Sequence, residues 1–212
     1  MTTFRTIFCA LALLIAPATA FAQGEAPAGA RVIYRGATLI DGAGAAPRPG
    51  VSIVTEGPLI LDIVTDDASY AATPGVRIID ASQLYVLPGL IDAHVHLATP
   101  PDANSARAVL RRQLYSGVTA VRDMADDLRS ISELAREARL GEIQAPDIYF
   151  AALMAGPSFF EDPRTAAAAM GETPGHAPWM QAIDDRTDLR LAVSMARGTN
   201  ASAIKIYANL PA

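Results

Sequence analysis

The chain has 212 residues, of which 51% are hydrophobic and 18% charged, and its formal net charge is -5. This composition is typical of a globular protein and excludes a disordered or fibrous chain. Seventeen basic residues against 22 acidic ones leave no positive surplus for a phosphate backbone, so we expect no nucleic-acid partner. No apolar run reaches the ~20 residues that span a bilayer, so we expect no membrane span. The single cysteine excludes a disulfide framework.

The first 22 residues have the order of a secretory signal peptide. One positive charge precedes an apolar run from Ile7 to Ile15, and small residues then lead to Ala20-Phe21-Ala22. That order matches an A-x-A cleavage site after Ala22. We therefore expect residues 1–22 to be removed, residues 23–30 to form a flexible linker, and the mature protein to be periplasmic or secreted.

Residues 31–86 are predicted to form a small antiparallel β domain. Short apolar runs alternate there with turns that contain Gly or Pro, a spacing typical of short strands. The predicted strands cover 31–34, 37–40, 51–54 and 59–64.

From residue 87 the pattern changes to strands that alternate with amphipathic helices. The predicted strands cover 89–97, 118–121, 148–153 and 203–207, the predicted helices cover 105–116, 128–140 and 188–196, and a long loop covers 156–186. This alternation is typical of βα units around a parallel sheet. Four strands are half of the eight in a closed (β/α)8 barrel. We therefore expect an α/β fold in which about four βα units form part of a TIM barrel.

The strongest chemical signal is the pair His94 and His96 in the first of these strands. Successive side chains of a strand point to opposite faces, so the two imidazoles share a face with Asp92. Two neutral imidazoles on one face can ligate one divalent metal, and a nearby carboxylate can orient one of them. Both lie at the C-terminal end of the strand, where parallel barrels place their active sites. Two solvated histidines on an edge strand are the alternative interpretation.

Lys205 is the only lysine of the chain, and the other 16 of its 17 basic residues are arginine. A sequence that otherwise uses arginine keeps a lysine where an amine is required. The functional interpretations are a modified, metal-bridging lysine or a Schiff-base lysine. The alternative is a lysine that extends its amine into solvent from the strand end.

Two further residues are weaker candidates for substrate binding. Arg122 ends the second βα strand beside Asp123, where a structural ion pair explains it equally well. His176 lies in the long loop, where a histidine is usually solvated. The run Ala166–Met170 in the same loop is either a helix or a flexible lid.

Several of these segments resemble the amidohydrolase superfamily, in particular its imidazolonepropionase- and prolidase-like branch. The string Leu87-Pro88-Gly89-Leu90-Ile91-Asp92-Ala93-His94-Val95-His96 resembles the family's first barrel strand, which carries the H-x-H metal motif. Residues 36–42 resemble the opening of its β-sandwich, 116–124 its second strand and 203–207 its fourth strand. The resemblance implies a partial β-sandwich at 31–86 and an incomplete TIM-barrel domain at 87–212.

The resemblance also implies an activity and a set of ligands. It implies hydrolysis of an amide, cyclic amide or dipeptide-like substrate by a metal-activated hydroxide. His94 and His96 would hold one of one or two divalent ions, with zinc the expected metal, and carboxylated Lys205 would bridge. The family's later histidines and its general-base Asp follow the fourth strand, but no histidine follows Lys205 here. We therefore expect this chain to be an N-terminal fragment that is inactive alone.

Two other functions stay open at this point. A Schiff-base lyase barrel would use Lys205 but leaves His94 and His96 without a role. A non-catalytic periplasmic protein would use the two histidines to bind metal or a partner without turnover. The expected partner of the enzyme is a small-molecule or peptide-like substrate, and the pattern specifies no oligomeric state.

Overall fold

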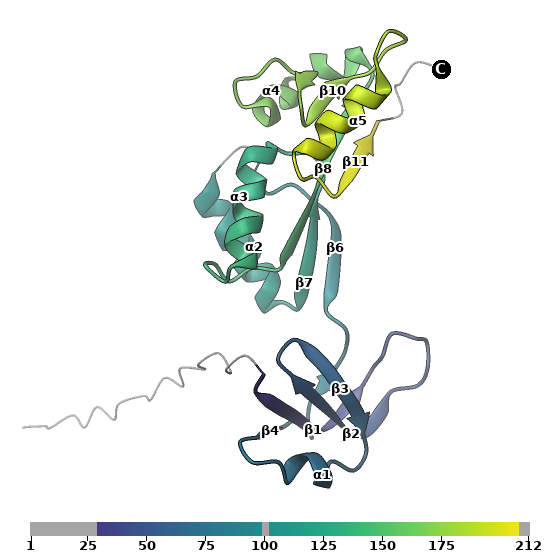
Figure 1. The fold of residues 1–212 in the computed structure, drawn as a ribbon, viewed down its shortest axis with the longest axis vertical. Coiled ribbons are helices and arrows are strands. Elements are labelled where there is room, and N and C mark those ends of the chain that lie inside the picture. The colour runs from purple at the N-terminus through teal and green to yellow at the C-terminus, as the bar shows by residue number, and fades with distance from the viewer. Residues whose placement is uncertain (1–28, 99–101, 208–212) are drawn as a thin grey trace, which may run out of the picture. The chain divides into compact units, whose positions relative to one another are not determined.

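The computed structural model describes residues 29–98 and 102–207 (Figure 1). The chain divides into two compact units, one ending at Leu87 and the other beginning at Pro88. The predicted signal peptide, residues 1–22, and most of the predicted linker at 23–30 lie outside the described residues. Within the described ranges, no helix combines the length and the apolar character that crossing a membrane requires.

The first unit contains one five-stranded sheet in its described residues. Its elements are β1 (Arg31–Leu39), β2 (Arg48–Glu56), β3 (Leu59–Val64), α1 (Ala68–Ala71), β4 (Arg77–Asp80) and β5 (Tyr85–Val86). The strand order is β3-β2-β1-β4, and β5 also pairs with β1. The buried side chains of Leu39, Val51 and Ile53 form a small core with Val86. The partial β-sandwich stays a prediction.

The sheet is mixed, so the prediction of an antiparallel domain is wrong in part. β1 pairs with β2, and β2 with β3, in antiparallel orientation, but β4 and β5 pair with β1 in parallel. The reason is that the segment with α1 returns the chain to the end of the sheet at which β1 begins. The two strands predicted at 31–34 and 37–40 are one strand, interrupted at Gly36 (φ 77°) by a shift in register.

The second unit has the predicted alternation of strands and helices. In chain order it contains β6 (Leu90–Val95), α2 (Ala103–Tyr115), β7 (Val118–Asp123), α3 (Leu128–Arg139), β8 (Asp147–Ala155), α5 (Leu189–Gly198) and β11 (Ala203–Ile206). β6, β7, β8 and β11 form parallel pairs in that order. α2 packs on β7 and α3 on β8, and the two helices contact one another (Figure 1). All four strands therefore end at the same edge of the sheet.

The segment predicted as a long loop, 156–186, is largely structured. After β8 it forms the 3-10 helix η1 (Pro157–Glu161), the helix α4 (Pro163–Ala169) and the strands β9 (His176–Ala177) and β10 (Met180–Ala182). β10 pairs in parallel with the last three residues of β8, and β9 pairs with β10. The helix offered at Ala166–Met170 overlaps α4. The prediction missed η1, β9 and β10 because each is too short to show a repeating apolar pattern.

The helix α3 shows why the local sequence was sufficient for the main elements. Asp127 caps its N-terminus by accepting a hydrogen bond from the backbone N–H of Arg129. Its buried residues Leu128, Ile131, Leu134 and Ala135 recur at the spacing of one helix face. Gly141, with a φ of 69°, follows its end. The cap and the apolar face together fix where α3 begins and which side of it is buried.

Candidate metal centre

The two histidines of the predicted metal motif lie together at the end of β6. His94 is inside the strand and His96 follows it, and their ring centroids are 5.4 Å apart. Both residues are exposed. The reason is that β6 is the outermost strand of this sheet in the described residues and its pairing with β7 is irregular between Asp92 and Val95. The carboxylate of Asp92 accepts a hydrogen bond from the backbone N–H of His94 instead of orienting an imidazole.

A loop after β7 supplies the carboxylate that contacts the motif. Oδ1 of Asp126 lies 2.9 Å from Nδ1 of His96, and Oδ2 accepts a hydrogen bond from the backbone N–H of Ala98 at 2.6 Å. Asp123, at the end of β7, accepts hydrogen bonds from the backbone N–H groups of Leu97 and Asp126. The two aspartates therefore hold the chain that follows β6.

The two aspartates are almost fully buried, with exposed fractions of 0% for Asp123 and 1% for Asp126. Burial, and then the nearby charge of Asp126, raise the pKa of Asp123 to about 8. The backbone N–H of Leu97 acts in the opposite direction by stabilising the charged form. Burial therefore favours the protonated form of Asp123, which avoids two negative charges side by side.

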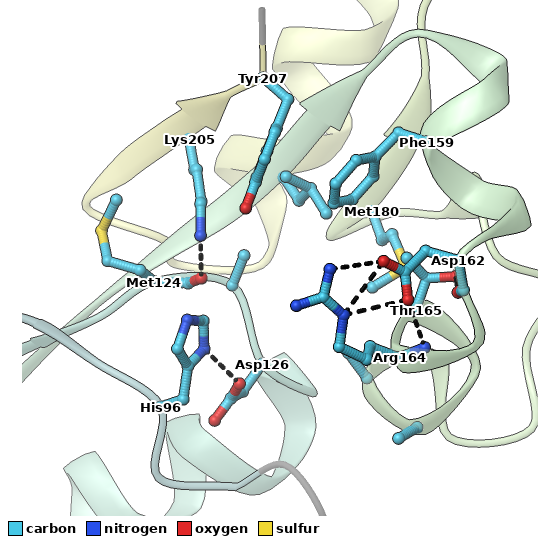
Figure 2. A pocket seen from close by; sticks show the side chains of 14 residues that line it. His96, Met124, Asp126, Phe159, Asp162, Arg164, Thr165, Met180, Lys205 and Tyr207 are labelled. Atoms are coloured by element: carbon cyan, nitrogen blue, oxygen red, sulfur yellow. Dashed lines mark hydrogen bonds and ion pairs between the residues drawn. The ribbon is translucent and has the colours of Figure 1, made fainter. Parts of the chain in front are cut away.

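Lys205 extends from β11 toward the same loop. Its Nζ donates a hydrogen bond to the backbone carbonyl of Met124 at 3.1 Å and lies 5.0 Å from the centre of the Tyr207 ring (Figure 2). The next residue, Ala125, has a φ of 79°, which is unfavourable for a residue with a Cβ. This strained turn directs the carbonyl of Met124 toward Lys205 and the carboxylate of Asp126 toward His96.

His96 and Lys205 line one cavity of about 490 Å³. Most of its remaining wall is apolar, and it comes from the loop after β7, from β8, from the 156–186 segment and from the residue after β11. Those apolar residues include Leu153, Phe159, Ala168, Met180 and Tyr207 (Figure 2). Asp162 and Arg164 form an ion pair in the wall opposite the histidine. The guanidinium of Arg164 lowers the pKa of Asp162 to about 2, so this acid stays ionised.

The two candidate substrate-binding residues lie elsewhere. Arg122 is exposed, and its Nε donates a hydrogen bond to the backbone carbonyl of Ala93 at 3.0 Å. His176 is exposed in β9. Neither residue lines the cavity that contains His96 and Lys205. The structure therefore brings together His96 and Lys205 in one cavity, with the His94 ring beside that of His96, and it places neither Arg122 nor His176 in that cavity.

The residues present fit part of a metal site. Zinc takes three or four protein ligands, usually imidazole nitrogens, thiolates or carboxylate oxygens. In residues 29–98 and 102–207, no three His, Cys, Asp or Glu side chains are placed to hold one ion together. His94 and His96 supply two imidazoles, and Nε2 of His96 is turned away from the Asp126 contact. Lys205 would add carboxylate-type oxygens only as a carbamate.

Sequence reasoning missed Asp126 and the apolar wall. A signal for Asp126 was present, because Ala125-Asp126-Asp127 follows the C-terminal end of a predicted strand, where parallel barrels collect functional residues. The wall residues Phe159 and Met180 gave no such signal. Each lies in a short element, where no repeating apolar pattern shows which way a side chain points.

Residues 85–205 match the model of the amidohydrolase family. The chain belongs to the amidohydrolase family. The N-acyl-D-aspartate deacylase of Alcaligenes xylosoxydans xylosoxydans is 43% identical over 72 residues, and the adenine deaminase of Rubrobacter xylanophilus is 29% identical over 156 residues. The crystal structure of a Xaa-Pro dipeptidase with bound methionine in the active site is similar to 84% of this chain, with a TM-score of 0.66 and 25% identity.

The chain is shorter than these amidohydrolase relatives. The deacylase match covers 34% of the chain and 14% of the relative, and the deaminase match covers 72% of the chain and 25% of the relative. The match to the dipeptidase structure covers 47% of that chain. The family match includes the histidine pair and Lys205, so it covers every residue of the candidate metal centre named above.

Proposed function

We propose that the protein containing this chain is a metal-dependent hydrolase that cleaves a carbon–nitrogen bond in an amide, cyclic amide or dipeptide-like substrate. The observation that carries this proposal is the shared cavity of His96 and Lys205, two residues 109 positions apart that the family match spans. The relatives are named as a deacylase, a deaminase and a dipeptidase, and each of these reactions breaks a carbon–nitrogen bond.

His94 and His96 would hold a divalent ion, with zinc as the expected metal, and Lys205 as a carbamate would bridge to a second ion. A divalent ion bound there supplies a Lewis acid for the substrate carbonyl and lowers the pKa of a bound water. Residues of this chain orient the proposed ligands. Asp126 contacts the imidazole of His96, and the ring of Tyr207 lies beside the amine of Lys205. The proposed general base is an aspartate outside this chain.

The cavity wall also points to the shape of the substrate. Phe159 and Tyr207 are in ring contact, with centroids 4.2 Å apart, and Met180 lies in the same wall. An apolar wall gains free energy when it removes an apolar group from water. We therefore propose that the substrate carries an aliphatic or aromatic group on the side that faces the 156–186 segment.

Metal content tests the proposal in the full-length protein. We expect inductively coupled plasma mass spectrometry to find one or two zinc ions per chain in the purified protein. His96→Ala is expected to lose metal and hydrolysis together, while His176→Ala, the third histidine, keeps its metal. Hydrolysis is screened with N-acyl amino acids, dipeptides and cyclic amides. Full activity after complete removal of metal by a chelator would contradict the proposal, as would trapping of substrate on Lys205 by borohydride.

Two proposals concern the protein as a whole. Residues 1–22 direct export, and the parallel sheet of the second unit is part of a (β/α)8 barrel. N-terminal sequencing of protein recovered from the periplasm or medium tests the first, and we expect the mature chain to begin at Gln23. Retention in the cytoplasm with an intact Met1 would contradict it. A crystal structure of the full-length protein tests the second.

A further inference from the structure

The two carboxylate oxygens of Asp126 contact groups that lie in different directions. Its Oδ2 accepts from the backbone N–H of Ala98 at 2.6 Å, and its Oδ1 lies 2.9 Å from Nδ1 of His96. Figure 2 shows the carboxylate directed at the imidazole of His96, at the side of the cavity near Lys205. The carboxylate itself is buried, whereas the imidazole of His96 is 46% exposed.

This geometry favours one tautomer of His96, the form that carries its hydrogen on Nδ1. An ionised carboxylate only accepts hydrogen bonds, so Nδ1 must be the donor. A neutral imidazole has one donor and one acceptor nitrogen, so the lone pair then belongs to Nε2. A metal ion binds only the nitrogen with the free lone pair. The Asp126 contact therefore prepares Nε2 of His96 as the ligand atom.

The backbone around Asp126 holds the carboxylate in this position. The N–H of Asp126 donates to Asp123, and Asp123 also accepts from the N–H of Leu97, the residue after His96. The two aspartates thus connect the loop after β7 to the residues directly after the metal motif. Rotation of the Asp126 side chain would break the bond to Ala98 as well as the contact with His96.

We propose that Asp126 is a positioning residue that holds His96 in the Nδ1–H form and in the orientation in which Nε2 binds the metal. The inference rests on the proposed metal centre and adds to it a residue that does not itself touch the ion. A carboxylate behind a metal-binding histidine typically changes metal affinity by about 10- to 100-fold when it is removed.

The substitution Asp126→Asn reverses the contact without changing the size of the side chain. The N–H of Ala98 requires an acceptor at the Oδ2 position, so the amide oxygen of the new side chain is kept there. The NH2 group then faces His96 and donates to Nδ1, which forces the hydrogen onto Nε2. Asp127→Asn is the matched control, because Asp127 is also buried but contacts Arg129 and Ser130.

The experiment compares the full-length protein with both variants. We expect Asp126→Asn to bind Zn²⁺ about 10- to 100-fold more weakly by competition with a fluorescent chelator, and Asp127→Asn to bind as the wild type does. Nitrogen-15 NMR of the metal-free proteins assigns the tautomer of His96, with His96→Gln identifying its signals. We expect Nδ1–H in the wild type and Nε2–H in Asp126→Asn. Asp126→Glu, which restores a carboxylate, is expected to recover part of the affinity.

The outcomes separate this inference from the proposed function. If the wild type binds no Zn²⁺, the proposed function is overturned. The proposed role of Asp126 in positioning His96 then fails as well, whichever tautomer of His96 is found. A wild type that binds Zn²⁺ but has His96 in the Nε2–H form before binding overturns the role of Asp126 alone. So does a folded Asp126→Asn protein with wild-type affinity. If Asp126→Asn does not fold, the tautomer of the wild type and the affinity of Asp126→Glu decide.

Discussion

Both units of the chain bury an acidic side chain, and the two units stabilise it in different ways. In the first unit, Asp67 forms two hydrogen bonds with the guanidinium of Arg35, at 2.8 and 2.9 Å. These bonds lower the pKa of Asp67, and they outweigh the effect of burial in the opposite direction. In the second unit, Asp123 accepts hydrogen bonds from backbone N–H groups, and burial raises its pKa to about 8.

The difference shows what each acid does. A carboxylate paired with a guanidinium joins two parts of a fold and takes no further part in chemistry. A buried acid beside a second acid, as Asp123 is beside Asp126, has its pKa raised toward neutral pH. Strongly perturbed acids of this kind are concentrated at functional sites, and this one lies behind the histidine pair.

The largest effect is expected from Lys205→Arg, which affects the site and not the first unit. Arginine keeps the positive charge but cannot form a carbamate, so we expect loss of the bridging metal. Activity of the full-length enzyme should fall by about 10³-fold or more, since several kcal/mol of transition-state stabilisation are removed. Metal analysis and steady-state kinetics measure this, with hydrogen exchange of residues 31–86 as the internal control. Two metals and full activity in the variant would show that Lys205 is not carboxylated.

The next effect is expected from Gly89→Ala, at the start of β6. A Cβ at this position would overlap the side chain of Thr119 on β7. We expect a loss of about 1–3 kcal/mol in the stability of the second unit, because overpacking shifts neighbouring backbone. Hydrogen exchange of β6 and β7 measures it, and Thr119→Ala should restore part of the loss.

Gly198→Ala is the matched control, since a Cβ built there meets no atom within 4 Å other than its chain neighbours and the backbone of its own helix. Equal exchange in the two glycine variants would show that the contact of β6 with β7 is not tight.

Asp123→Asn is expected to have a similar or smaller effect that depends on pH. The amide can replace only one of the two acceptor oxygens, so we expect a loss of about 1–3 kcal/mol at low pH. The folded protein keeps a proton that the unfolded chain releases above its ordinary pKa of 3.8. The stabilisation from Asp123 is therefore complete below pH 3.8 and is lost as the pH rises toward 8.

The stability difference between wild type and Asp123→Asn should accordingly shrink from pH 4 to pH 8. Exchange of the Leu97 amide in metal-free protein measures it at each pH. A difference that grows with pH would mean that Asp123 is ionised in the folded protein.

Asp67→Asn should give the smallest effect and the opposite dependence on pH. Because its pKa is lowered, the stabilisation from Asp67 is present above pH 3.8 and is lost as the pH falls below it. The side chain of Arg35 is 44% exposed, so water replaces much of the pair. We expect hydrogen exchange in β1 and β4 to rise by no more than about fivefold at neutral pH. A larger rise in β6 or β7 would show that the two units are coupled.

Much of the second unit was predictable because its signals are local. The α3 face from Leu128 to Ala135 and the cap at Asp127 are set by residues within one helix. The same holds for the histidine pair, because a spacing of two places both side chains on one face of a strand. The first unit was less predictable. The alternation of apolar residues in a strand does not show whether it pairs parallel or antiparallel with its neighbour. The direction of β4 depends on how the chain returns through α1.

The sequence by itself determined the βα alternation, the histidine pair and the unusual single lysine, since each is a feature of neighbouring residues or of composition. The tertiary structure alone decided that Asp126, and not Asp92, contacts His96, and that Lys205 reaches the carbonyl of Met124. These partners are 30 and 81 residues apart. Contacts over such separations depend on strand order and on the turn at Ala125, which neighbouring residues alone do not specify.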